Sequence, residues 1–235
     1  MEQLPPTFAA TREALRAVAC YAIAPARRAR TGRIGLRSTG DGFGTPPFDD
    51  GRRFVVRGDR LARDRGDEIA ITTVRAACGF LGVEPSPDPG VGHDLPPFDP
   101  DGALAVDSTA SFALGTWYAF GQAVLDRLRA GAGIDVGRIS EAQLWPEHFD
   151  LAVTVEPYLG GPVNVGFSPG DRFDGRPYVY VGPHDAARLD SPFWNAPFGA
   201  FLPYGDLVAT PDPVARALRF VGEGLRAAEH APTSR

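Results

Sequence analysis

The chain has 235 residues, of which 43% are hydrophobic and 23% charged, fractions typical of a globular protein and not of a disordered one. Glycine and proline, at 28 and 23 residues, are abundant enough to indicate many turns and to disfavour a helical bundle. A net charge of −5 argues against non-specific nucleic-acid binding, which needs a broad basic face, so no nucleic-acid partner is expected.

The first expected element is a helix over residues 7–29, because apolar side chains recur there at helical spacing. Pro25 is expected to end or kink this helix. The apolar stretch 17–26 is only about half as long as a membrane span and follows Arg12, Glu13 and Arg16, and residues 1–6 lack the basic region of a secretory signal. We therefore expect a cytoplasmic protein without a membrane partner.

Three short strands are expected next, because β-branched and apolar residues alternate with turn signals. These strands cover residues 33–37, 53–57 and 68–72. Gly58 and Asp59, between the second strand and Leu61, are typical of a hairpin turn. Arg33 and Arg37 share one face of the first strand, where they suit a carboxylate or phosphate, although arginines exposed on an edge strand are more common.

A short helix is expected over residues 74–81, capped by Thr73 and ended by Gly82. Cys20 and Cys78 lie in apolar surroundings without a C-x-x-C pairing, so we expect two buried hydrophobic side chains.

The second part of the chain follows the same order of elements as the first. A helix is expected over residues 108–130, and another from Pro213 to about Glu229 with Asp212 as its N-terminal cap. Three strands lie between them, over residues 149–156, 163–167 and 178–181. The sequence therefore predicts a single α+β domain, residues 1–235, made of two similar halves. The halves, about 7–83 and 108–230, each have a helix, three antiparallel strands and a helix, and a proline-rich loop, 84–107, connects them.

Two glycine-containing motifs resemble known functional loops without meeting their requirements. Residues 166–170 match the G-x-S-x-G pattern of a hydrolase nucleophile, Ser168, but Pro169 lacks the N–H that would stabilise an oxyanion. The glycine-rich run 40–45 follows a strand, but Pro46 and Pro47 prevent the helix that a phosphate-binding loop requires. We interpret this run as a wide turn.

The strands of the second half place polar and aromatic side chains on one face of a sheet. If their apolar residues point into the core, the alternation leaves Asp150, Thr154, Asn164 and Ser168 on the other face, with Tyr178 and Tyr180 on the third strand. This patch is typical of a pocket floor, and the alternative is the ordinary solvated face of an antiparallel sheet.

Further candidates come from the segments around this sheet. His148 and His184 each neighbour an acidic residue, which is compatible with an open metal site or a general base, but no HxH or HExxH motif is present. Trp194 belongs to an aromatic loop that closes a ligand pocket or, alternatively, covers the core.

Several segments together resemble a family of proteins of high-GC bacteria to which no activity is assigned. They include residues 30–36, 42–46, 144–152, 168–171 and 177–183, with the sequences LWPEHFDLA and SPGD the most specific. The resemblance spans nearly the whole chain and implies a single cytosolic fold. It also implies that position 184 is often aromatic, which argues against a metal role for His184.

The sequence therefore predicts small-molecule binding, or an enzyme of unrecognised type, with a site near residues 145–150 and 168–171. The candidate ligand-binding residues are Trp145, His148, Asp150, Asn164, Ser168, Asp171, Tyr178, Tyr180 and Trp194. No catalytic residue, metal ligand or cofactor is assigned. One alternative is a metal-dependent hydrolase or oxygenase. The other is an interaction module that associates with itself or a partner through its uneven charge, +5 over residues 1–75 and −10 over 76–235.

Overall fold

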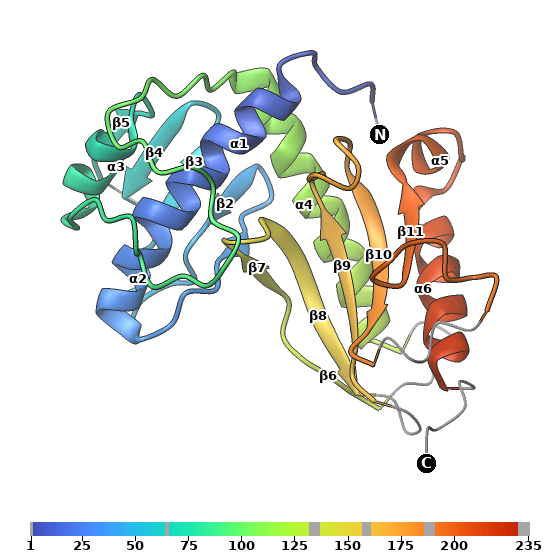
Figure 1. Ribbon diagram of the computed structural model, residues 1–235. Coiled ribbons are helices and arrows are strands. Elements are labelled where there is room, and N and C mark those ends of the chain that lie inside the picture. Colours follow the sequence, from blue (N-terminus) through green and yellow to red (C-terminus); the bar gives the residue numbers. More distant parts are fainter. Residues whose placement is uncertain (1, 64–65, 132–136, 157–160, 186–190, 230–235) are drawn as a thin grey trace. The chain divides into compact units, whose positions relative to one another are not determined.

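The computed structural model describes residues 2–63, 66–131, 137–156, 161–185 and 191–229 (Figure 1). Helices and antiparallel sheets both occur, which confirms the α+β class. The chain divides into two compact units. The N-terminal unit comprises Leu4–Ala119 and Gln143–Asp150, and the C-terminal unit comprises Met1–Gln3, Phe120–Ala142 and Leu151–Arg235. The expected arrangement of two similar halves is not confirmed, because these units do not follow the boundaries 7–83 and 108–230.

The N-terminal unit begins with a helical stretch that continues past Pro25. It consists of α1 (Phe8–Val18), a π-helical turn η1 (Ala19–Ile23) and α2 (Ala24–Thr31). Of the two expectations for Pro25, that it ends the helix is wrong, because the π turn precedes it and proline fits the first turn of the α-helix that follows, while a kink at Pro25 stays a prediction. Gly32 ends α2 in the left-handed conformation, with its N–H donating to the carbonyl of Arg28 at 2.8 Å.

The sheet of this unit has five antiparallel strands where three were expected. They are β1 (Arg37–Ser38), β2 (Gly42–Gly44), β3 (Phe54–Arg57), β4 (Arg60–Arg63) and β5 (Glu68–Ala70), in that order. The hairpin turn at Gly58–Asp59 is confirmed, since Arg57 pairs with Arg60. The interpretation of 40–45 as a wide turn is wrong at β2. Side chains at Gly42 and Gly44 would collide with the backbone of β3, so glycine is what allows this strand to pair.

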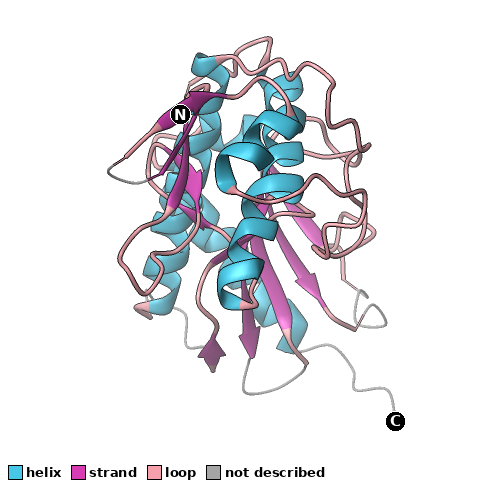
Figure 2. Ribbon diagram, turned by 90° about the vertical axis from the view of Figure 1, so that its left-hand side faces the viewer, coloured by secondary structure: helices cyan, strands magenta, loops and turns pink. Residues whose placement is uncertain are grey.

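The remaining elements of this unit agree more closely with the sequence. Helix α3 (Val74–Leu81) begins at Thr73, whose hydroxyl accepts from the N–H of Ala76 at 3.0 Å, and ends at Gly82. Residues 84–107 contain no helix or strand and form the long loop drawn green in Figure 1. Figure 2 draws all described loops and turns in pink. Helix α4 (Ser108–Arg129) follows and contributes residues to both units. Among the described residues, no helix has the length and apolar character needed to cross a membrane.

The C-terminal unit contains an antiparallel sheet in the order β11-β10-β9-β8-β6. Its strands are β6 (Arg138–Ile139), β8 (Asp150–Glu156), β9 (Val163–Ser168), β10 (Tyr178–Pro183) and β11 (Ala200–Pro203), and the short β7 (Gln143–Trp145) belongs to the N-terminal unit. The three strands expected from the sequence are present within about two residues of their predicted ends. The sequence did not predict β11.

Helices cover one face of this sheet, as Figure 1 shows for α4 and α6 (Pro213–Glu229). The ring of Phe167 lies against Gly121 of α4, and Val181 lies against Gly224 of α6. The short α5 (Tyr204–Val208) connects β11 to the final helix, which starts at the expected Asp212 cap. Because side chains alternate along a strand, the side chains next to Phe167 and Val181 point to the opposite face of the sheet. We call this the open face of the C-terminal sheet because neither α4 nor α6 lies on it, although Ser168 and Tyr178 on this face are each only 3% exposed.

Candidate functional site

The segment 144–150, with the sequence LWPEHFD, is held in the N-terminal unit by side chains of its helices. The thiol of Cys20 donates to the carbonyl of Pro146 at 3.0 Å, and Nε of Arg16 donates to the carbonyl of Glu147 at 2.9 Å. Leu144 forms an antiparallel bridge with Leu36. The two side-chain bonds satisfy backbone carbonyls in the turn between β7 and β8, which indicates that this turn is part of the fold of the N-terminal unit.

Phe149 is the most constrained residue of this segment. It has a positive φ of 55°, which is rare for an aromatic residue, and its ring packs edge-on against Phe43 and Tyr118. The hydroxyl of Tyr118 donates to the Phe149 carbonyl at 2.6 Å. Burial of this hydroxyl, together with the nearby charge of Asp150, raises the pKa of Tyr118 well above its ordinary value. Tyr118 is therefore a neutral donor that fixes the backbone at this bend.

The three candidate residues in this segment differ in exposure. Trp145 is half-buried in β7, His148 is exposed, and Asp150 is only 5% exposed. The half-buried Glu147, which sequence analysis did not single out, has an Oε2 atom without a hydrogen-bond partner in the described part of the chain. Burial raises the pKa of this carboxyl, and positive charge on His148 acts in the opposite direction.

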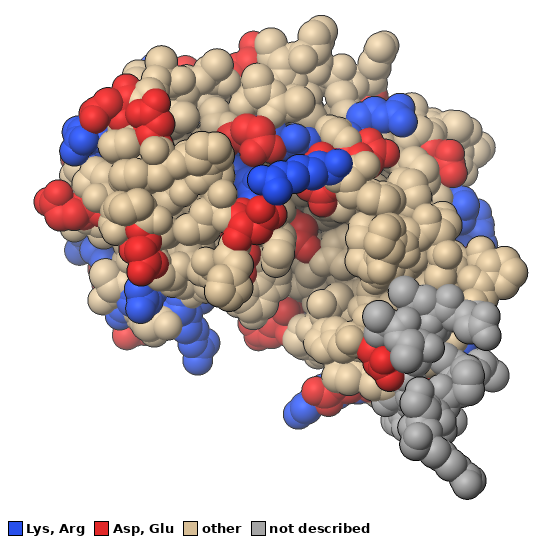
Figure 3. All heavy atoms as spheres, in the orientation of Figure 1, with Lys and Arg blue, Asp and Glu red and all other residues tan. Residues whose placement is uncertain are grey.

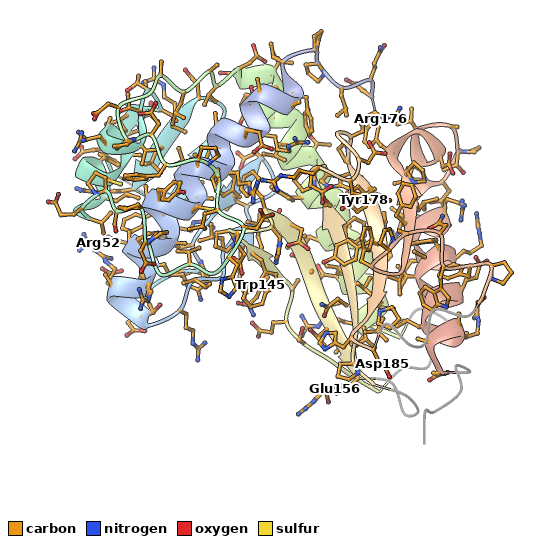
Figure 4. All side chains as sticks on the ribbon, in the orientation of Figure 1. Arg52, Trp145, Glu156, Arg176, Tyr178 and Asp185 are labelled. Atoms are coloured by element: carbon orange, nitrogen blue, oxygen red, sulfur yellow. The ribbon has the colours of Figure 1, made fainter. Side chains whose placement is uncertain are left out.

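Four of the other candidates, Asn164, Ser168, Tyr178 and Tyr180, belong to strands β9 and β10 and lie on the open face of the C-terminal sheet, and Asp171 lies in the turn after β9. Tyr178 pairs directly with Ser168 across β10 and β9, and its hydroxyl donates to Oδ2 of Asp171 at 2.6 Å. The other carboxylate oxygen of Asp171 accepts from the N–H of Phe173 at 2.7 Å, so one aspartate both shapes the turn and holds the tyrosine. Figure 4 places Tyr178 and Arg176 at one end of this sheet and Glu156 and Asp185 at the other.

Ser168 does not have the geometry of a hydrolase nucleophile. It is 3% exposed, and its hydroxyl oxygen accepts from the N–H of Gly170 at 3.1 Å. The residues that follow form turns, whereas a nucleophile elbow requires a helix at this point.

Around Tyr178, aromatic rings from three segments form a continuous cluster, which we call the aromatic cluster. Its members are Phe173, Tyr178, Tyr180, Phe198 and Phe201. Ring centroids of Phe173 lie 5.0 Å from Phe198 and 4.9 Å from Phe201, in edge-to-face geometry. Phe173 is 42% exposed, so the cluster presents an apolar surface beside the Asp171 carboxylate.

Tyr180 lies between the two ends of the open face. Its ring covers Gly166, the residue directly opposite on β9, and any side chain at Gly166 would overlap this ring. Glycine at this position therefore sets where the Tyr180 ring lies, which the pattern of residue types did not indicate.

At the far end of this face, three polar side chains form a hydrogen-bonded row. The Asn164 carbonyl oxygen accepts from the hydroxyl of Thr154 at 3.0 Å and lies 3.0 Å from Nε2 of His184. In this row the imidazole of His184 therefore contacts the side-chain amide of Asn164 and not a carboxylate. Asn164 is half-buried and His184 is exposed.

Trp194 is also in the C-terminal unit, in the loop before β11. Its ring packs edge-on against Phe193, which in turn lies 5.3 Å from Phe220 of α6. Its indole Nε1 is buried, with no hydrogen-bond partner in the described ranges. Phe193 thus packs on the helical side, and the role of Trp194 as a cover for the open face stays a prediction.

The candidate residues therefore fall into two sets. Trp145, His148 and Asp150 belong to the N-terminal unit, and the remaining candidates belong to the C-terminal unit.

Within residues 2–63, 66–131, 137–156, 161–185 and 191–229, no group of three or more His, Cys, Asp or Glu side chains is placed to hold a metal ion. No family model, curated protein or solved structure matches the chain.

Proposed function

We propose that this protein binds a small planar organic molecule on the open face of the C-terminal sheet. The observation that carries the proposal is the hydrogen bond between Tyr178 and Asp171, made at the border of the aromatic cluster. The ligand contacts Phe173 through its planar part and donates a hydrogen bond or carries a positive charge toward Asp171.

The chemistry of the cluster supports this class of ligand. Aromatic rings bind planar groups by edge-to-face and offset contacts, and they lose little side-chain entropy on binding. The Asp171 side chain already accepts from the Tyr178 hydroxyl and from the backbone N–H of Phe173, so its position is set before a ligand arrives. An exposed carboxylate beside an apolar surface favours donors and cations over anions.

The structural alternative is that the aromatic cluster only fastens the turn 171–175 to the sheet. Both interpretations predict a loss of stability when the ring of Phe173 is removed, so stability does not separate them. Measurements of ligand binding separate the two interpretations, because only the functional one predicts that affinity depends on the charge of the ligand.

The test compares three probes of nearly the same shape, namely benzamidine, benzamide and benzoate, by ligand-observed NMR and calorimetry. We expect benzamidine to bind most tightly and benzoate most weakly. Asp171→Asn keeps an oxygen for the Phe173 N–H and removes the charge, so it should abolish the preference for benzamidine. Phe173→Ala should weaken binding of all three probes.

Phe112→Ala is the matched control, since Phe112 is 50% exposed and lies on α4 in the N-terminal unit. It should leave binding unchanged. Equal binding of the three probes, or equal effects of the two phenylalanine variants, would refute the proposal.

Three expectations from the sequence accompany this proposal. They are cytoplasmic location, the resemblance to a family of high-GC bacterial proteins, and a relation between the halves 7–83 and 108–230. All three rest on residue patterns alone. Isolation of the protein from its native host by cell fractionation would test the first of them.

A further inference from the structure

The N-terminal unit contains a buried arginine that neither its fold nor the proposed binding face explains. Arg27, on α2, is only 8% exposed, and its Nη1 atom has no hydrogen-bond partner in the described ranges. A buried guanidinium N–H without an acceptor destabilises the fold, because on folding it loses its hydrogen bond to water and no protein acceptor replaces it.

The surroundings of this guanidinium are rich in positive charge. Its Nη1 lies 3.4 Å from the point where a side chain at Gly35 would begin, so it lies against the backbone of that residue. Arg33 and Arg37 stand two residues to either side of Gly35, and both are exposed. Figure 3 shows several blue side chains around the C-terminal end of α2.

Local structure fixes the positions of these arginines. The hydroxyl of Thr31 donates to the carbonyl of Arg27 at 3.0 Å and accepts from the N–H of Arg33 at 3.3 Å. This single side chain therefore couples the last turn of α2 to the start of the next segment. The carbonyl oxygen of the Gln143 side chain, from β7, also lies over Gly35, so this amide must turn its NH2 group inward to contact an anion there.

Electrostatics agree with the geometry. Burial, and then the charges of Arg33 and Arg37, lower the pKa of the Arg27 guanidinium. The charged neighbours that act on Arg27 are thus two further cations. Repulsion of this kind favours binding of an anion, which offsets the charge of Arg27.

We propose that Arg27, Arg33 and Arg37 form a binding site for a phosphate dianion. The buried Nη1 of Arg27 donates from the floor of the site, and the exposed Arg33 and Arg37 reach the same anion from the solvent side. Guanidinium groups bind oxyanions through paired N–H donors, and a dianion offsets more of this charge than a single carboxylate does. Inorganic phosphate and an organic phosphate monoester offer the same chemistry.

The experiment measures binding to the full chain in a phosphate-free buffer at pH 7.5, by calorimetry and by the shift of the unfolding temperature. The probes are inorganic phosphate, phenyl phosphate and acetate. We expect both phosphates to bind and acetate to bind more weakly. Preference for phenyl phosphate over inorganic phosphate would identify a monoester as the better ligand, and the reverse would identify the free ion.

Arg33→Gln removes one exposed guanidinium and should weaken phosphate binding by about tenfold, the usual effect of losing a hydrogen bond to a charged group. Arg52→Gln is the matched control, because Arg52 is exposed in the same unit and pairs with Asp50. It should leave phosphate binding unchanged.

Arg27→Met should abolish the stabilisation by phosphate, whatever its effect on the unfolding temperature without ligand. If this variant does not fold, the pair Arg33→Gln and Arg52→Gln still decides the question. The proposal is overturned by three results: no phosphate-dependent shift in the natural protein, equal responses to phosphate and acetate, or equal binding by those two variants.

Discussion

Glycines on the helices of the N-terminal unit provide the sharpest test of how this unit packs. Gly79 on α3 has open space where a side chain would begin, with no atom within 4 Å. At Gly115 on α4 the same position lies 2.5–2.7 Å from backbone atoms of Asp41 and Gly42. The two residues therefore carry the same helix propensity and opposite packing environments.

Substitution by alanine separates these two effects. At Gly79 the change should stabilise the protein by roughly 0.5–1 kcal/mol, because alanine restricts the unfolded chain and favours the helix. At Gly115 the same gain is opposed by an overpacking cost of about 1–3 kcal/mol, since backbone does not move aside as a side chain does. We therefore expect Gly79→Ala to be stabilised and Gly115→Ala to be destabilised.

The assay is thermal and urea unfolding followed by circular dichroism. For a chain of this size, about 1 kcal/mol shifts the unfolding temperature by roughly 2–4 °C, so the two variants should differ by several degrees. Gly224→Ala on α6 should change stability by an amount between these two, because its new methyl group lies 2.9–3.0 Å from the side chains of Val181 and Phe193. Side chains can move aside more easily than backbone can. A Gly115→Ala variant as stable as Gly79→Ala would refute the close approach of α4 to β2.

Three further predictions concern individual side chains. Gly166→Ala should displace the Tyr180 ring and alter the near-ultraviolet circular dichroism of the protein, while an unchanged spectrum would contradict the stacking of this ring on β9. Burial raises the pKa of Glu147 in the folded state, so its ionisation destabilises the fold as pH rises through that range. Glu147→Gln should therefore raise the unfolding temperature at pH 7.5 and lose this advantage near pH 4, and a gain equal at both pH values would contradict it. Burial raises the pKa of Cys20 to about 12 and that of Cys78 to about 11, so both thiols should resist iodoacetamide at pH 8 until the protein unfolds, as mass spectrometry would show.

The sequence predicted elements whose signals are local. Thr73 and Gly82 delimit α3, and Asp212 begins the final helix, because caps act through hydrogen bonds within one turn. The alternation of apolar residues predicted three strands of the C-terminal sheet and the shared face of Tyr178 and Ser168. The α+β class follows from these elements.

Local signals failed where distant backbone decides the conformation. Gly42 and Gly44 resemble a turn in sequence, yet they form β2 because only glycine lets this strand approach β3. Pro25 resembles a helix end, yet the preceding π turn places it where its missing N–H is not needed. A steric contact with β3 decides the first case and the hydrogen-bonding pattern of the π turn decides the second, and residue type alone reveals neither.

The candidate site shows the same division between sequence and tertiary structure. Residue type identified Asp171 and Tyr178, but the hydrogen bond between them and the surrounding aromatic cluster depend on how the turn 171–175 folds over the sheet. The segment 144–150 is distinctive in sequence, and the structure assigns it to the N-terminal unit, where its carbonyls accept from α1 and η1. The sequence identified candidate residues from their chemical types, and tertiary structure decided which of them meet, because contacts between distant segments depend on packing and not on local pattern.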